Sequence, residues 1–155
     1  MKAVQEQNIG SDLMSQVLGR VLQILPRFRE IDWENTNSAV WRRGRWLSDF
    51  VAFPETQTQT LDDLLHIEAQ KQSLKANTAQ FVAGLPANNA LLWGARGAGK
   101  SSLIHGLLQE YAADGLRLVE LRKDELAELS EIVARLSVES YKFIIFCDDL
   151  SFEEE

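Results

Sequence analysis

The octapeptide GARGAGKS at residues 94–101 constrains the fold of this 155-residue chain more than any other feature. It matches the pattern G-x-x-x-x-G-K-[ST] at every specified position. A short apolar run at residues 90–93 precedes it, and residues 100–111 follow with apolar side chains recurring on one helical face. An apolar strand that leads into a glycine loop and then a helix is the context this pattern requires, so we expect a nucleotide phosphate loop here.

The residue types in this octapeptide suit the binding of phosphate. Glycine lets the backbone wrap closely around phosphate oxygens, and the backbone amides of residues 97–100 would point inward as an anion nest. The helix that starts near Lys100 adds the positive end of its dipole. We expect the Lys100 ammonium to bridge the β- and γ-phosphates of ATP as a catalytic group, and the Ser101 hydroxyl to be a ligand of Mg²⁺.

The predicted phosphate site extends along the whole loop and into the helix. Its expected members are Gly94, Ala95, Arg96, Gly97, Ala98, Gly99, Lys100, Ser101 and Ser102. Three roles stay open for Arg96, which are contact with phosphate, contact with a neighbouring subunit and a solvent-facing position.

Residues 143–149, FIIFCDD, carry the second signal, an apolar strand that ends in two carboxylates. This arrangement resembles the second nucleotide motif of P-loop ATPases. We expect Asp148 to hold Mg²⁺ through water, and Asp149 to orient or deprotonate the attacking water. Both lie at the carboxyl end of a strand, where open α/β sheets bind ligands. The alternative is a solvated acidic loop or an aspartate that caps a helix.

Predicted strands and helices alternate in the C-terminal part of the chain. Strands are predicted at residues 90–93, 116–121 and 143–147, with helices at 100–111 and 124–136 between them and an earlier helix at 67–81. Solidly apolar strands in this order predict a parallel sheet with both faces covered by helices. We therefore predict an α/β fold, the three-layer sandwich of the P-loop NTPases.

The N-terminal part has a different texture. Residues 11–25 have apolar side chains at helical spacing and end before Pro26, which predicts an amphipathic helix. The apolar stretch at 41–53 contains WRRGRW, which we interpret as a helix that packs its tryptophans on the core and exposes its arginines to water. The alternative is contact with nucleic acid through stacking and charge. The polar run at 54–60 is a predicted linker, so we divide the chain into an N-terminal helical extension at 1–60 and a core at 61–155.

Charge and cysteine content narrow the classes of protein further. The formal net charge is −7, and the whole excess lies in residues 120–155, which hold 11 acidic and 4 basic side chains. An acidic net charge of this kind does not favour nucleic-acid binding. No apolar run reaches the roughly 20 residues of a membrane span, and the N-terminus has no pattern of a secretory signal. Cys147 is the single cysteine, so no intrachain disulfide can form and we expect a cytoplasmic protein.

Two stretches resemble a bacterial group of AAA+-related ATPases that is catalogued only as a domain of unknown function. They are residues 61–108, which include NNALLWGARGAGKSS, and FIIFCDDLSFEEE at residues 143–155; the resemblance covers about residues 41–155. It implies a core in which ATP sits at an interface between copies of the protein, with Leu65 and Ile67 lining the adenine. In the intact protein it implies Mg²⁺-dependent ATP hydrolysis that drives the remodelling of a partner protein.

The chain departs from the AAA+ pattern in two ways. Asp149 stands where glutamate is usual, and its shorter side chain favours weaker positioning of water. The chain also stops at Glu155, before two further strands, a sensor residue, an arginine finger and a helical lid, so we expect an N-terminal fragment.

Three other functions stay open at this point. They are a nucleotide-gated binding module with incidental turnover, a small-molecule or nucleotide kinase, and a DNA-associated ATPase of the helicase-loader kind. His66 and His105 have no ligand-like neighbours in the sequence, so we expect packing or surface roles for them.

Overall fold

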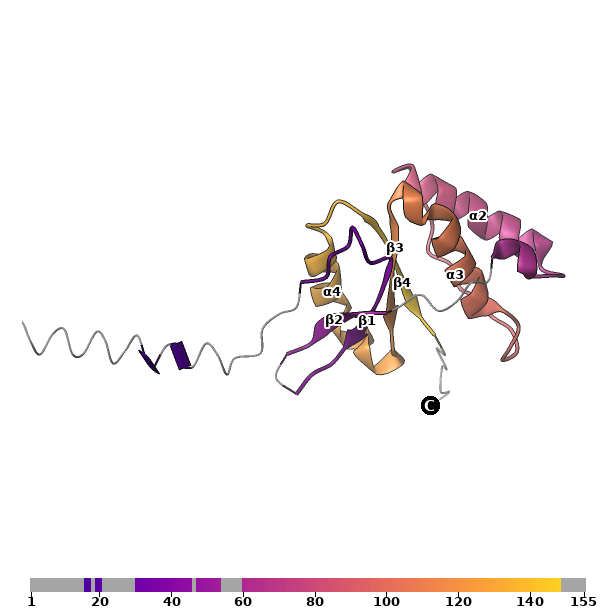
Figure 1. Cartoon of the computed structure of the whole chain (residues 1–155). Coiled ribbons are helices and arrows are strands. Elements are labelled where there is room, and N and C mark those ends of the chain that lie inside the picture. The colour runs from indigo at the N-terminus through magenta and orange to yellow at the C-terminus, as the bar shows by residue number, and fades with distance from the viewer. Residues whose placement is uncertain (1–15, 18, 21–29, 46, 54–59, 149–155) are drawn as a thin grey trace, which may run out of the picture.

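The computed structural model describes residues 16–17, 19–20, 30–45, 47–53 and 60–148 (Figure 1). The strands are β1 (Ser38–Arg42), β2 (Asp49–Ala52), β3 (Leu116–Leu121) and β4 (Lys142–Cys147). The labelled helices are α2 (Glu68–Val82), α3 (Lys100–Tyr111) and α4 (Leu129–Leu136). Three 3₁₀ segments are η1 (Leu61–Asp63), η2 (Ala112–Asp114) and η3 (Lys123–Glu128). The predicted α/β class is confirmed.

The sheet is built around β3, which has a parallel strand on each side. The strand order is β2-β1-β3-β4, with β1 and β4 parallel to β3, and β2 antiparallel to β1. The register pairs Val40 with Glu120 and Glu120 with Phe146. The carboxyl ends of β1, β3 and β4 therefore meet at one edge of the sheet.

Helices cover both faces of the sheet, as the sequence predicted (Figure 1). The cluster on the α3 face consists of Ile104, Leu108, Leu116 and Leu118, with Ile144 and Phe146 of β4 packed against it. The cluster on the α4 face includes Trp33, Trp41, Phe50, Val119, Leu121 and Ile132. Because alternate residues of β3 enter the two clusters, its apolar run lacks the alternation of a half-exposed strand.

The helix predicted within residues 41–53 is wrong, because this part of the chain is a β-hairpin. β1 and β2 pair from Ala39 with Ala52 to Arg42 with Asp49. Trp41 is fully buried on the α4 face, while Arg42 is exposed, so the expected separation of tryptophan from arginine occurs on a strand. The hairpin shares its sheet with β3, so the sheet crosses the boundary that we placed at residue 60.

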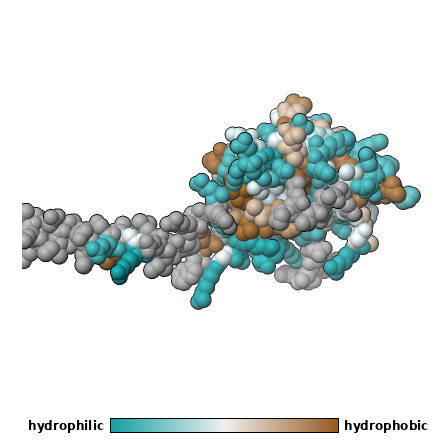
Figure 2. Space-filling model, in the orientation of Figure 1, coloured by the Kyte–Doolittle hydropathy of each residue, from teal (hydrophilic) through white to brown (hydrophobic). Residues whose placement is uncertain are grey.

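The strand predicted at residues 90–93 is absent from the described sheet. Leu91 and Trp93 are 67% and 89% exposed. They belong to a set of large hydrophobic residues that lie at the surface of the protein, and Figure 2 shows one face of that surface. Only Leu92 packs against the cluster on the α3 face. The preceding residue Asn88 is bonded to α2 instead, since its backbone N–H donates to Asn77 Oδ1 at 2.9 Å and its carbonyl accepts Asn77 Nδ2 at 2.8 Å.

The remaining predicted elements in the described residues are present. The helices at 67–81 and 100–111 correspond to α2 and α3, and the strands at 116–121 and 143–147 to β3 and β4. The helix at 124–136 is divided between η3 and α4. The helix at 11–25 lies outside the described residues apart from 16–17 and 19–20, which are helical, and the linker at 54–60 lies outside apart from Thr60. In the described parts of the chain, no helix has the length and hydrophobicity that crossing a membrane requires.

A buried carboxylate ties the hairpin to the segment after β3. Glu125 is fully buried and accepts hydrogen bonds from the backbone N–H of Arg122 at 2.9 Å and of Arg43 at 3.4 Å. The Arg122 guanidinium donates to the same carboxylate at 3.2 and 3.1 Å. Nearby, Glu128 accepts Trp41 Nε1 at 2.8 Å and forms an ion pair with Arg43. These bonds fix the carboxyl end of β1 against η3.

The Glu125 network predicts an unequal effect of two neighbouring substitutions. We expect Glu125→Gln to lower the free energy of unfolding by about 1–3 kcal/mol, because one carboxylate acceptor becomes an amide donor facing buried N–H groups. Asp124→Asn is the matched control, since the Asp124 side chain is 60% exposed and its pairing with Arg122 is worth little. Urea denaturation followed by circular dichroism measures both, and equal losses in the two variants would contradict the role of Glu125.

Candidate functional site

The glycine loop at residues 94–101, the predicted phosphate loop, joins the segment at residues 90–93 to the first turn of α3. Its three glycines have positive φ angles, +144° at Gly94, +82° at Gly97 and +83° at Gly99. A residue with a Cβ atom adopts this region only with strain, so the glycine spacing of the sequence motif is required by the backbone path. Gly99 is the N-cap of α3, and the exposed loop before it leads directly into the helix N-terminus.

The Lys100 side chain folds back over the loop. Its ammonium donates to the carbonyl oxygens of Gly94 and Ala95, each at 3.1 Å. The backbone N–H of Ala98 donates to the Ala95 carbonyl at 3.2 Å. The lysine charge is therefore held against the start of the loop, which has one internal backbone hydrogen bond.

Ser101 and Asp148 are brought together although 47 residues separate them. The Ser101 hydroxyl donates to Asp148 Oδ2 at 2.9 Å. Ser101 lies in the first turn of α3, and Asp148 follows the last residue of β4. The two predicted metal ligands thus meet at the carboxyl edge of the sheet. Asp149, the predicted catalytic carboxylate, lies outside the described residues.

The turn at residues 65–67, predicted to line adenine, lies beside the glycine loop through the preceding residue, Leu64. Lys71 holds it by donating its ammonium to the carbonyls of Leu61 and Leu64 at 3.1 and 2.7 Å. Leu64 Cδ2 lies 3.6 Å from where a Cβ atom on Gly99 would stand. The side chain of Leu65 is 69% exposed, and Ile67 is half-buried as the N-cap of α2. His66 between them has φ +66°, an uncommon value for a residue other than glycine.

The other predicted phosphate-binding residues are accessible. The exposed members are Gly94, Ala95, Arg96, Gly97 and Ala98, and the half-buried ones are Gly99, Lys100, Ser101 and Ser102. Arg96 makes no hydrogen bond or ion pair within the described residues, which leaves its guanidinium facing solvent.

Two residues near Asp148 were not predicted from the sequence. Glu120 is on β3 beside the end of β4, and its Oε1 lies 3.2 Å from Nε2 of His105 on α3. His105 comes one helical turn after Ser101, and its side chain is 11% exposed. A carboxylate near the carboxyl end of a mostly apolar strand was the available signal, and it identifies Glu120 once β3 is known to neighbour β4.

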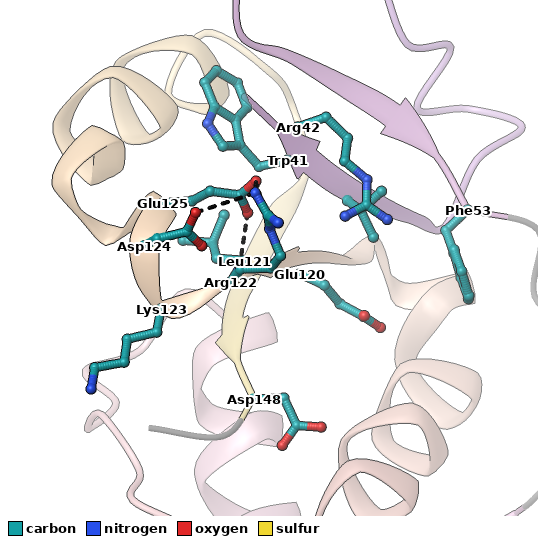
Figure 3. A pocket seen from close by; sticks show the side chains of 11 residues that line it. Trp41, Arg42, Phe53, Glu120, Leu121, Arg122, Lys123, Asp124, Glu125 and Asp148 are labelled. Atoms are coloured by element: carbon teal, nitrogen blue, oxygen red, sulfur yellow. Dashed lines mark hydrogen bonds and ion pairs between the residues drawn. The ribbon is translucent and has the colours of Figure 1, made fainter. Parts of the chain in front are cut away.

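A pocket of about 490 Å³ opens beside this cluster at the ends of β1, β3 and β4 (Figure 3). Its lining residues are Val40, Trp41, Arg42, Phe53, Glu120, Leu121, Arg122, Lys123, Asp124, Glu125 and Asp148. Asp148 therefore borders both the phosphate loop, through Ser101, and the pocket.

The pKa of the Cys147 thiol is affected by the negative charge of the neighbouring Asp148. Burial raises the pKa of Cys147, and the negative charge of Asp148 raises it further. The thiol is consequently protonated at neutral pH, which makes it a poor nucleophile and a poor metal ligand.

The donor set at Ser101 and Asp148 fits Mg²⁺. A hydroxyl and a carboxylate are hard oxygen ligands, and Mg²⁺ commonly uses one or two such protein groups together with substrate phosphates and water. Among the described residues, no group of three or more histidine, cysteine, aspartate or glutamate side chains is placed to hold a metal by itself.

Comparison with known protein families matches residues 34–155 to one family. The chain belongs to the DUF815 family of proteins of unknown function. The match in this DUF815 protein begins before β1 and includes both the glycine loop and the acidic strand end. No curated protein and no solved structure matches the chain.

Close packing of α3 against η1 predicts the effect of one added methyl group. A Cβ atom at Gly106 would stand 2.7 Å from Leu61 Cδ2 and 3.3 Å from the Leu61 backbone nitrogen. We expect Gly106→Ala to lower the free energy of unfolding by about 1–3 kcal/mol through overpacking. Urea denaturation of Gly106→Ala, Leu61→Ala and the double variant gives the interaction free energy between the two positions. Because Leu61→Ala removes the clash, it should lower the free energy of unfolding less in the Gly106→Ala variant than in the native protein. If the losses of the two single variants add up to that of the double variant, this packing is contradicted.

The position of the Asp148 charge predicts a shift in thiol reactivity. We expect Asp148→Asn to lower the pKa of Cys147, because the substitution removes a negative charge that disfavours the thiolate. The rate of alkylation by iodoacetamide against pH gives the midpoint, and the curve should move to lower pH. Glu139→Gln removes an exposed charge elsewhere and serves as the control. If the alkylation midpoint is the same in Asp148→Asn and in the native protein, the Asp148 carboxylate does not influence the pKa of the thiol, and the prediction is wrong.

Proposed function

We propose that this DUF815 protein is an ATP-binding protein of the AAA+ type, with a P-loop NTPase core and Mg²⁺-dependent ATP hydrolysis in the intact protein. One observation carries the proposal. The Ser101 hydroxyl, at the end of the glycine loop, donates to Asp148 at the end of β4 at 2.9 Å. Two motifs that were identified separately in the sequence thus form one site at the sheet edge where α/β folds bind ligands.

The loop residues supply the groups that hold phosphate. Positive φ angles at Gly94, Gly97 and Gly99 shape the loop, and the N-terminus of α3 provides free N–H groups with the positive end of the helix dipole. Lys100 exchanges its bonds with two loop carbonyls for bonds to phosphate oxygens, and is stronger there because both partners are charged. Bound Mg²⁺ neutralises phosphate charge, and Ser101 and Asp148 hold it.

The turn at residues 65–67 supplies the base contact in this proposal. Its contact with Gly99 through Leu64 fixes it beside the phosphate loop, and Lys71 holds its carbonyls. Leu65 and Ile67 present apolar surface suited to a planar base. Asp149 acts on the attacking water, and turnover drives the remodelling of a partner protein, with ATP at an interface between copies of the chain.

The exposed segment before the loop favours a second candidate function. Leu91 and Trp93 are 67% and 89% exposed immediately ahead of Gly94. ATP bound to the loop would order these apolar side chains and create a surface for a partner without needing hydrolysis. A nucleotide-gated binding module is therefore the alternative, and steady-state turnover separates the two functions.

Calorimetric titration of the chain with ATP and ADP in the presence of Mg²⁺ tests the proposal. We expect micromolar binding that Lys100→Ala weakens roughly 10- to 100-fold, since a charge-assisted hydrogen bond contributes about 1.5–3 kcal/mol. Lys75→Ala is the matched control, because Lys75 is on α2 and pairs with Glu110 away from the loop. Ser101→Ala should reduce the dependence of ATP affinity on Mg²⁺.

The outcomes are distinct. Absence of nucleotide binding by a chain with folded circular dichroism and a cooperative melt would refute the proposal. Binding without phosphate release from the full-length protein, with Asp149 intact, would select the binding module over the ATPase.

A further inference from the structure

Among the charged side chains that line the pocket beyond Asp148, three lie at the carboxyl ends of three adjacent strands, namely Arg42, Glu120 and Asp148. Val40, Glu120 and Phe146 pair across β1, β3 and β4, so their side chains share the α3 face of the sheet. Two residues further along β1 and β4 come Arg42 and Asp148, which continue the same face. Figure 3 shows the side chains of Arg42, Glu120 and Asp148 around the pocket.

Among the described residues, Arg42 and one carboxylate oxygen of Glu120 have no hydrogen-bond partner. Arg42 is exposed and makes no hydrogen bond or ion pair within the described part of the chain. Glu120 Oε1 is buried and has no hydrogen-bond partner, although His105 Nε2 lies 3.2 Å away as an ion-pair neighbour when protonated. The other charged residues of the lining have partners, because Arg122 is paired with Asp124 and Glu125, and Lys123 has an interaction of its own. Arg42 is therefore available to a ligand, and Glu120, whose side chain is 28% exposed, lines the same pocket.

The charges determine what kind of molecule the pocket suits. An anion alone would pair with Arg42 but meet the repulsion of Glu120 and Asp148. A cation alone would leave Arg42 unpaired. Glu120 pairs with Val40, so Arg42 lies two residues further along the neighbouring strand, roughly 4.8 Å across and about 6.6 Å along from Glu120, and one small molecule that carries both charges reaches both residues.

The volume of the pocket and its apolar lining residues favour an organic ligand. About 490 Å³ lies within the range of small-molecule pockets. Val40 and Phe53 give the pocket an apolar side next to the charged row. Phe53 is 36% exposed, so a ligand side chain that covers it removes apolar surface from water.

We propose that this pocket binds an α-amino acid with an apolar side chain, whose carboxylate pairs with Arg42 and whose ammonium pairs with Glu120. The proposal goes beyond the nucleotide site, because neither Arg42 nor Glu120 belongs to the phosphate loop and binding requires no nucleotide. Since Asp148 borders both sites, the bound amino acid lies next to the predicted Mg²⁺ ligand.

The test titrates the full chain without nucleotide with L-leucine and two analogues that each lack one charged group. 4-Methylpentanoate keeps the carboxylate and the side chain, and 3-methylbutylamine keeps the ammonium and the side chain. Calorimetry gives the affinities. We expect L-leucine to bind at least 10-fold more tightly than either analogue.

Matched variants locate the site. Arg42→Gln and Glu120→Gln should each weaken L-leucine at least 10-fold, while Arg45→Gln, an exposed arginine outside the pocket lining, should leave the affinity unchanged. Circular dichroism and the melting temperature establish that each variant is folded. Failure of L-leucine to bind native protein, equal binding of the carboxylate analogue, or full affinity in folded Arg42→Gln would each overturn the proposal. None of these results bears on ATP binding, which Lys100→Ala tests separately.

Discussion

Parallel pairing of β3 with a strand on each side is the constraint on which the rest of the structure depends. It buries alternate residues of β3 under α3 and α4, so that one strand of six residues contributes to both hydrophobic clusters. It also brings the carboxyl ends of β1, β3 and β4 to one edge. Arg42, Glu120 and Asp148 come from distant parts of the chain, and they line one pocket only because of this alignment.

The carboxyl edge of the sheet has two parts with different chemistry. On the α3 side lie the positive-φ glycines, Lys100 and the Ser101–Asp148 hydrogen bond, which together make up the proposed nucleotide and Mg²⁺ site. On the hairpin side, Glu125 pairs with Arg122, and Glu128 pairs with Arg43. Together with the hydrogen bond from the Arg43 backbone N–H to Glu125, these pairs fix β1 in place. The basic cluster in WRRGRW is therefore divided, with Arg43 held in a structural ion pair and Arg42 left facing the pocket. This pairing reduces the positive charge that a nucleic-acid surface would need.

The sequence predicted best where a single local pattern decided the structure. The helix at α3 and the strand at β3 have the predicted limits, because helical spacing and a continuous apolar run were clear there. The hairpin was missed because β1 is buried on both faces and therefore shows no alternation, and its six-residue connection to β2 has no two-residue turn signal. Residues 90–93 have strand-like composition, but the described sheet provides no partner for them and Asn88 is bonded to α2.

The sequence by itself determined the glycine loop, the helix that follows it and the acidic end of β4, since these depend on φ angles, helical periodicity and local apolar runs. Only the tertiary structure decided that Ser101 meets Asp148, that Glu120 and His105 stand beside them, and that Arg42 faces the same pocket. The physical reason is register. Side chains far apart in the chain become neighbours only when strand order and pairing are set, and those are set by burial of the whole sheet between its helices.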